Sequence, residues 1–179
     1  GLTMGEIARM AIGEGWAKAA KLTVVRCRNY DHSTHYELPI APSPNLPTQH
    51  SVYLYPSTCL FEGTVLSMGR GTEAPFELFG HPEMSGCDFS FTPQPNAGSK
   101  NPPHNGVLCY GVDLREVADE DIWVEGINIG YVVDAYHNLA IGEKFFKPMF
   151  EKLIGVEWVR KMIIAGATAE EIGGPRWSR

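Results

Sequence analysis

Residues 62–72 read EGTVLSMGRGT, and this glycine-rich stretch decides how the rest of the sequence is interpreted. Gly63, Gly69 and Gly71 allow the backbone to adopt positive φ angles or to approach a ligand closely. Arg70 stands between two of these glycines, where its guanidinium can bind a carboxylate or a phosphate through two hydrogen bonds. The stretch lacks the Gly-Lys-Ser/Thr ending of a Walker loop and does not match GxGxxG, so it predicts neither nucleotide-binding motif.

The polar side chains of this stretch admit two interpretations. Glu62 is a candidate general acid or base and a candidate acceptor for a sugar hydroxyl, and Ser67 and Thr72 add hydroxyl groups nearby. Alternatively, Glu62 and Arg70 form an ion pair whose role is to close the loop. The residues by themselves favour the ion pair, because such pairs are common in proteins.

A second unusual segment precedes it, the PSPNLPT of residues 42–48. Its three prolines hold the backbone extended and would present Asn45 in a fixed direction. The amide of Asn45 can donate and accept hydrogen bonds to a sugar hydroxyl or an N-acetyl group. A structural turn, in which Asn45 bonds its own backbone, explains the pattern equally well.

The composition is that of one globular domain over residues 1–179. Apolar residues make up 44% and charged residues 20%, and the net charge of −6 argues against a nucleic-acid partner. No stretch approaches the roughly 20 apolar residues of a membrane span. Residues 1–3 carry no signal pattern and look like a processed or engineered start, which leaves an upstream signal sequence open.

Cysteine and histidine positions predict neither a metal site nor a cofactor. The four cysteines contain no CxxC pair, and buried free thiols are favoured over two disulfides; they are Cys27, Cys59, Cys87 and Cys109. The DHSTH of residues 31–35 lacks the three or four converging ligands that a metal requires, so a polar loop is the better interpretation.

The N-terminal part is expected to hold a helix, a strand and a long loop. Thr3 is a candidate N-cap with Glu6 three residues later, the capping-box pattern. Leu22–Cys27 is apolar and β-branched, which predicts a buried strand. Prolines make residues 29–49 irregular.

Further along, Pro56 fits the first turn of a brief helix over residues 57–62 that ends at Gly63. Three strands and three helical segments complete the pattern: strands at 76–79, 88–92 and 106–114, an apolar helix at 127–139, an amphipathic helix at 150–164, and a short helix or turn at 167–172. Together these elements predict a mixed α/β (α+β) fold, a single compact domain with a small mixed sheet flanked by helices.

At this point the residues resemble a known family. PSPNLPT and the YPSTCLFEGTVLSMGRGTEAPFELFGHP of residues 55–82 are similar to signatures of the bacterial exo-β-N-acetylmuramidases, cell-wall recycling glycosidases long known as a domain of unknown function. LTMGEIARM, LTVVRC, CYGVDL and FEKLIGVEWVRKMIIAGATAEEI are similar too, in the family's order. The likeness spans nearly the whole chain, and the motif around Arg70 is its most specific part.

The resemblance implies an organisation. Family members have an N-terminal Rossmann-like domain followed by a smaller α/β domain that begins near the helix of residues 2–10. This chain would then be the C-terminal domain alone, expected to pack on the absent N-terminal domain. The active site would be a cleft between the two domains, with a key carboxylate on the missing half, so the chain alone is expected to be inactive.

The resemblance also implies a substrate, a terminal N-acetylmuramic acid of a muropeptide or peptidoglycan fragment. Arg70 is the candidate partner of its lactyl carboxylate. The candidates for hydroxyl and acetamido contacts are Asn45, Glu62, Ser67 and Thr72. Glu62 is a weaker candidate for one of the two carboxyl groups that glycosidases use. The substrate's location favours the periplasm or cell envelope.

Three residues depart from the family pattern. The family usually has Asn where this chain has Val65, and favours Trp and Arg where this chain has Tyr30 and His32. A non-catalytic glycan-binding module, or an auxiliary structural domain, is therefore the alternative to part of a working exo-muramidase.

Overall fold

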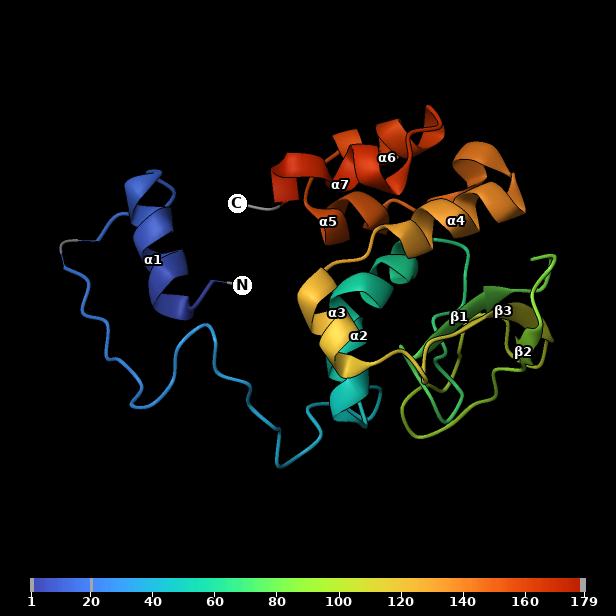
Figure 1. The fold of residues 1–179 in the computed structure, drawn as a ribbon, viewed down its shortest axis with the longest axis horizontal. Helices are drawn as coiled ribbons and strands as arrows, with labels where there is room; N and C mark the ends of the chain where they lie inside the picture. Colours follow the sequence, from blue (N-terminus) through green and yellow to red (C-terminus); the bar gives the residue numbers. More distant parts are fainter. Residues whose placement is uncertain (1, 20, 178–179) are drawn as a thin grey trace. The chain divides into compact units, whose positions relative to one another are not determined.

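The computed structural model describes residues 2–19 and 21–177 and divides the chain into two compact units, Gly1–Glu37 and Leu38–Arg179. Figure 1 shows the elements of both units along the chain. None of the described helices is long and apolar enough to cross a membrane. The mixed fold is confirmed, with helices around one small sheet.

The first unit is built on helix α1 (Met4–Gly13). The capping box is confirmed: the Glu6 amide donates to the Thr3 hydroxyl at 3.3 Å, and the Thr3 amide donates to the Glu6 carboxylate at 2.7 Å. The predicted buried strand at Leu22–Cys27 is wrong, because every residue of that segment is exposed. Among the described residues no strand pairs with it, and an apolar β pattern forms a strand only beside a partner.

The sheet belongs to the second unit and has three strands in the order β1-β3-β2, namely β1 (Leu78–His81), β2 (Phe89–Phe91) and β3 (Cys109–Asp113). Both strand pairs are antiparallel, so the sheet is antiparallel throughout where a mixed one was expected. All three predicted strands are present: the second and third are shorter than predicted, and the first is displaced by two residues toward the C-terminus. The first starts at Leu78 because Phe76, with a φ of 65°, occupies a turn.

Helix α2 (Gln49–Thr58) begins earlier than the sequence predicts. Thr48 and Ser51 form a second capping box, and Pro56 lies inside the helix, so the expected start at Pro56 is wrong. The chain continues directly into the 3-10 helix η1 (Cys59–Gly63), which does end at the predicted glycine.

After the sheet, the helix predicted at 127–139 is shorter, the one at 150–164 is divided in two, and the one at 167–172 is displaced and longer. The helices of this part are α3 (Asp119–Glu125), α4 (Gly130–Leu139), the 3-10 helix η2 (Gly142–Phe145), α5 (Met149–Ile154), α6 (Trp158–Ile164) and α7 (Ala169–Trp177). The single amphipathic helix expected at 150–164 is wrong. Gly155, with a φ of 78°, ends α5 in a left-handed turn, and the chain re-enters a helix three residues later.

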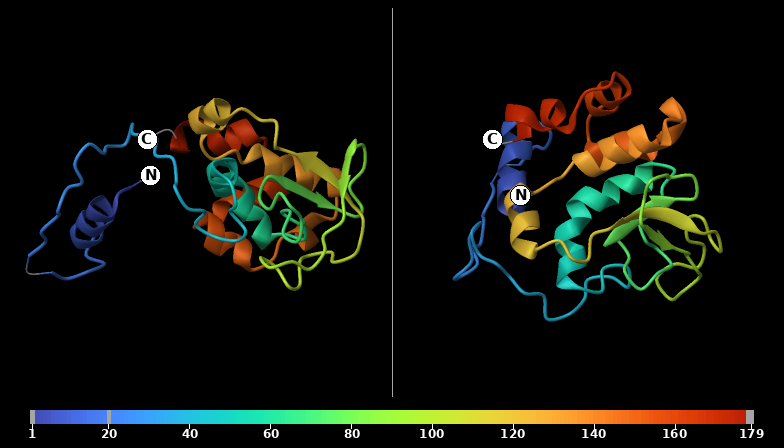
Figure 2. Two further views of the ribbon diagram at one scale, coloured as in Figure 1. Left: turned by 90° about the horizontal axis from the view of Figure 1, so that it is seen from below. Right: turned by 45° about the vertical axis from the view of Figure 1, so that its right-hand side comes forward.

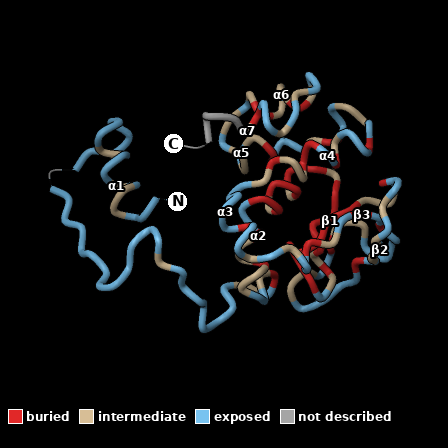
Figure 3. Tube along the Cα trace, viewed as in Figure 1, coloured by how far each residue is buried: buried red, intermediate tan, exposed pale blue. Residues whose placement is uncertain are grey.

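The core of the second unit forms where η1, β1, α4 and α5 meet. The Phe61 ring stacks on Phe79 with centroids 4.3 Å apart, and Tyr131 of α4 reaches the same ring at 5.8 Å. Because α4 also contacts α7, it lies between the sheet and that helix (Figures 1 and 2). Figure 3 shows the buried residues concentrated here, whereas the described residues of the first unit are exposed or intermediate.

His50 joins the start of α2 to the segment between β3 and α3. Its Nδ1 lies 2.5 Å from a carboxylate oxygen of Asp119, and its Nε2 lies 2.9 Å from the carbonyl oxygen of Leu114. The Asp119 carboxylate and the Leu114 carbonyl both accept, so both hydrogen bonds form together only when both ring nitrogens carry a proton and the ring is positively charged. Burial lowers the pKa of His50, but the hydrogen bonds to Asp119 and Leu114 and the charges of Asp119 and Glu77 outweigh it, and the net shift is upward.

We expect Gly63→Ala to lower the free energy of unfolding by about 1–3 kcal/mol, the usual cost of overpacking a core. A Cβ at this position would lie 2.5 Å from the Cα of Phe150. Urea denaturation of the chain measures the loss. Gly173→Ala is the matched control, because a Cβ there meets nothing within 4 Å, and the helical position leaves stability unchanged or higher. Equal losses in both variants would contradict the close approach at Gly63.

The charged His50 also predicts a pH dependence. Its folded pKa is raised, so its contribution to stability is complete below the unfolded value of about 6.5 and is lost as pH rises through the folded pKa. Wild type should therefore exceed His50→Gln in free energy of unfolding by more at about pH 6 than at about pH 9. Denaturation at both pH values tests this, and a difference that is constant with pH would show that folding leaves the pKa of His50 unchanged, against its contacts with Asp119 and Leu114.

Candidate functional site

The backbone of the glycine-rich segment is held on both sides. The Val65 amide donates to the Phe145 carbonyl at 3.0 Å, while the amide and carbonyl of Ser67 each bond Gly80 at 2.9 Å. The segment thus joins the helical part of the second unit to the sheet. Gly69 and Gly71 have φ angles of 81° and 83°, the conformations that the sequence led us to expect of glycine.

Glu62 and Arg70 meet at the two ends of this segment. Nη2 of Arg70 donates to the Glu62 carboxylate at 3.0 Å, and their side chains are 29% and 27% exposed for Arg70 and Glu62. The guanidinium carbon also lies 5.1 Å from the centroid of the Phe76 ring, a cation–π contact. The ion pair considered from the sequence is therefore present, yet both groups stay within reach of a ligand.

Tyr55 completes this surface; from the sequence it was expected in the core or in a cleft wall and was not among the candidate site residues. Its ring packs edge-on against Phe76 at 4.9 Å and remains 36% exposed. Burial raises the pKa of Tyr55, and the nearby Glu62 carboxylate raises it further, so the phenol is a proton donor at neutral pH. Tyr55, Glu62, Arg70 and Phe76 together form what we call the Arg70 patch.

Cys59 lies one helical turn after Tyr55 on the same side of α2 and η1. Burial raises the pKa of this thiol to about 11, with a contribution from Glu62. Only the thiolate is a strong nucleophile, so Cys59 is a poor candidate for covalent catalysis. All four cysteines are free, but Cys27 is exposed and Cys59 and Cys87 are only partly buried, so the expectation of four buried thiols is wrong.

Ser67 and Thr72 use their hydroxyls within the segment itself. The wholly buried Ser67 accepts from the Gly69 amide at 3.3 Å. Thr72 donates to the Gly69 carbonyl at 2.7 Å and accepts from the Ala74 amide at 3.1 Å. These bonds hold the backbone beside Arg70, and the sugar contacts assigned to the two hydroxyls stay a prediction.

Asn45 is buried rather than presented to solvent. Its amide nitrogen donates to the Gly98 carbonyl at 2.7 Å, and its buried side-chain oxygen has no hydrogen-bond partner among the described residues. The loop that it holds also contacts the glycine-rich segment, since the Asn96 amide nitrogen donates to the Thr72 carbonyl at 3.2 Å. The Asn45 side chain thus bonds a distant loop rather than its own backbone, and the sugar contact assigned to it stays a prediction.

The three residues that depart from the family pattern are Val65, Tyr30 and His32, and the structure shows the surroundings of each of them. The carbonyl of Val65 accepts from the His104 ring at 2.8 Å. In the first unit, the His32 ring lies 3.0 Å from the Glu6 carboxylate, and Tyr30 is exposed. Within the described residues, no three His, Cys, Asp or Glu side chains gather as metal ligands.

Comparison with known protein families shows which family the chain belongs to. Residues 53–177 match the description "Exo-beta-N-acetylmuramidase NamZ, C-terminal". The chain belongs to this exo-β-N-acetylmuramidase family. Residues 1–50 match the N-terminal description of the same family, so the helix and the 22–27 segment, which we expected to open the C-terminal domain, fall within the N-terminal match.

Two relatives of the family are informative. The peptidoglycan β-N-acetylmuramidase NamZ of Bacillus subtilis (strain 168) is 35% identical over 190 residues, covering 96% of this chain and 45% of that protein. A crystal structure of a DUF1343 family protein from Bacteroides fragilis matches with a TM-score of 0.89 and 53% identity, over 96% of this chain and 50% of the other. The chain thus spans about half the length of the relatives it matches.

A double-mutant cycle tests how the Glu62–Arg70 pair acts in the fold. Each side chain is more than a quarter exposed, so we expect a coupling energy of about 1 kcal/mol or less between Glu62→Gln and Arg70→Met. Urea denaturation of the four proteins measures it. A coupling above about 3 kcal/mol would instead mark a desolvated pair with a purely structural role.

Proposed function

We propose that this chain forms one wall of the sugar site in an exo-acting peptidoglycan glycosidase that releases terminal N-acetylmuramic acid. The observation that carries the proposal is the Arg70 patch, in which a cation, a carboxylate and a phenol lie partly exposed around an aromatic ring. Membership of the exo-β-N-acetylmuramidase family supports it.

Arg70 has N–H donors that its bond to Glu62 does not use and that can bind a substrate carboxylate. Its hydrogen bond to Glu62 uses Nη2, and a guanidinium carries five N–H donors in a fixed plane. N-acetylmuramic acid differs from N-acetylglucosamine by a lactyl group with a carboxylate. A bidentate bond between that carboxylate and Arg70 would separate the two sugars, because a substrate without the carboxylate leaves the cation unsatisfied.

Glu62 and Tyr55 act as positioning and binding residues in this proposal. One oxygen of Glu62 holds Arg70 in place, and the other can accept a sugar hydroxyl. Phe76 stiffens both neighbours, since Arg70 lies over its ring and Tyr55 packs against it. The key catalytic carboxylate is assigned to the N-terminal domain, so the isolated chain binds without turnover. We place the reaction in the periplasm or cell envelope, where its substrate lies.

The two-domain enzyme that contains this chain allows a direct test with a chromogenic N-acetylmuramide. We expect Arg70→Ala to lower kcat/KM about 10- to 100-fold, the effect of losing a charged hydrogen bond of about 1.5–3 kcal/mol. Hydrolysis of the N-acetylglucosaminide, however slow, should not change. Arg115→Ala is the matched control, because Arg115 also pairs with a carboxylate, Asp113, and lies 5.8 Å over a phenylalanine ring.

Each outcome of this assay is decisive. Normal turnover of the muramide by Arg70→Ala would remove Arg70 from the site. An equal loss on both sugars would assign Arg70 to general binding rather than to specificity. Binding of N-acetylmuramic acid without any turnover by the two-domain wild type would identify a glycan-binding module in place of an enzyme.

A further inference from the structure

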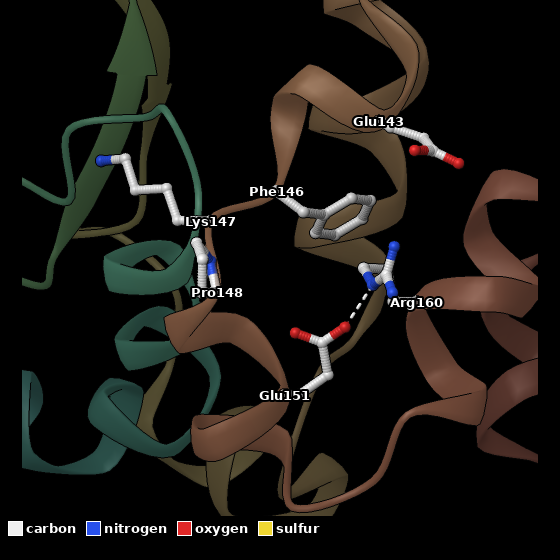
Figure 4. A pocket seen from close by; sticks show the side chains of 6 residues that line it. All are labelled: Glu143, Phe146, Lys147, Pro148, Glu151 and Arg160. Carbon is white, nitrogen blue, oxygen red and sulfur yellow. Dashed lines mark hydrogen bonds and ion pairs between the residues drawn. The ribbon is translucent and has the colours of Figure 1, made fainter.

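A cavity of about 390 Å³ opens between η2, α5 and α6, outside the Arg70 patch. Its lining residues are Glu143, Phe146, Lys147, Pro148, Glu151 and Arg160 (Figure 4). The volume lies in the range of about 300–1,000 Å³ that small-molecule sites occupy. No role is assigned to it by the glycosidase proposal.

The aromatic wall of this cavity is rigid. The Phe146 ring stacks on Tyr136 with centroids 5.6 Å apart and contacts Phe145 at 4.9 Å and Phe150 at 4.7 Å. Its backbone is fixed as well, since it pairs with Thr64 in an isolated bridge. A ligand therefore meets a preformed ring face, which lowers the entropic cost of binding.

The charged wall is only partly paired. Nε of Arg160 donates to the Glu151 carboxylate, and Figure 4 shows the two side chains pointing toward each other beside the Phe146 ring. Their side chains are 29% and 24% exposed for Arg160 and Glu151. Since Glu151 takes the Nε edge, the two terminal nitrogens of Arg160 stay available for a carboxylate.

The opposite charge comes from Glu143 of η2. This residue is exposed, and no ion pair engages its carboxylate within the part of the chain that the structure describes. Lys147 also lines the cavity, and Figure 4 shows its side chain directed away from Arg160. An ammonium group placed between Glu143 and the Phe146 ring would gain both an ion pair and a cation–π contact.

We propose that this cavity binds a small zwitterion of the amino-acid or dipeptide class, with its carboxylate on the terminal nitrogens of Arg160 and its ammonium between Glu143 and Phe146. A ligand that carries only a positive or only a negative charge would leave one of the two charged walls without a partner, and a neutral sugar would leave both walls without one. The site lies beyond the proposed muramidase site and does not depend on it.

The dipeptide alanyl-alanine is the probe, titrated into the 179-residue chain at low ionic strength and followed by NMR and calorimetry. We expect a dissociation constant of about 1 mM or below, with shifts centred on Phe146 and Arg160. N-acetyl-alanyl-alanine lacks the ammonium and alanyl-alaninamide lacks the carboxylate, and each should bind at least about tenfold more weakly.

Variants assign the two contacts separately. Glu143→Gln should weaken the binding of alanyl-alanine about tenfold and leave the binding of the acetylated peptide unchanged. Arg160→Lys should weaken the binding of alanyl-alanine to the same extent and leave the binding of the amide unchanged. The reason is that lysine can pair with Glu151 but cannot bind a carboxylate in bidentate fashion. Glu116→Gln, at an exposed glutamate outside the cavity, is the control and should bind normally. Equal binding of all three peptides, shifts outside the cavity, or no binding would overturn the proposal. Turnover of a muramide by the two-domain enzyme should be unchanged in either variant.

Discussion

The backbone of residues 63–67 is the constraint on which the rest of the second unit depends. On one side the Lys147 amide donates to the Gly63 carbonyl at 2.8 Å, and on the other side Ser67 bonds Gly80 of β1. The first contact is possible because Gly63 has no Cβ to meet the backbone of Phe150. This stretch of backbone therefore joins the helices to the sheet, with Glu62 directly before it and Arg70 shortly after it.

Local chemistry made part of the fold predictable from the sequence. The Thr3 capping box and the positive φ at Gly69 and Gly71 follow from properties of those residues alone. Helix η1 ends at Gly63 as expected, but Gly63 has no positive φ, and its lack of a Cβ serves the contact with Phe150. The errors arise where tertiary context decides. Leu22–Cys27 has the composition of a strand but no described partner strand. The apolar residues of 150–164 keep a helical spacing throughout, yet the chain leaves the helix at Gly155.

The candidate site was predictable to a similar extent. Arg70 and Glu62 were found because glycines flank one and an acid/base role suits the other, but the sequence could not show that they pair while staying accessible. Tyr55 was expected only in the core or a cleft wall, because a helix starting at Pro56 leaves it outside the turn that brings Tyr55, Cys59 and Glu62 to one side. The fixed direction expected of Asn45 comes from its amide bond to the distant Gly98 loop, a tertiary contact that the local sequence does not reveal.

The central claim is that the Arg70 patch binds the lactyl carboxylate of N-acetylmuramic acid. The most direct measurement is a crystal structure of the two-domain enzyme with this sugar bound. We predict a carboxylate oxygen within about 3 Å of a terminal nitrogen of Arg70, with the Glu62 bond retained or shared. A sugar whose carboxylate points away, with Arg70 bonded to Glu62 alone as in the free chain, would contradict the account.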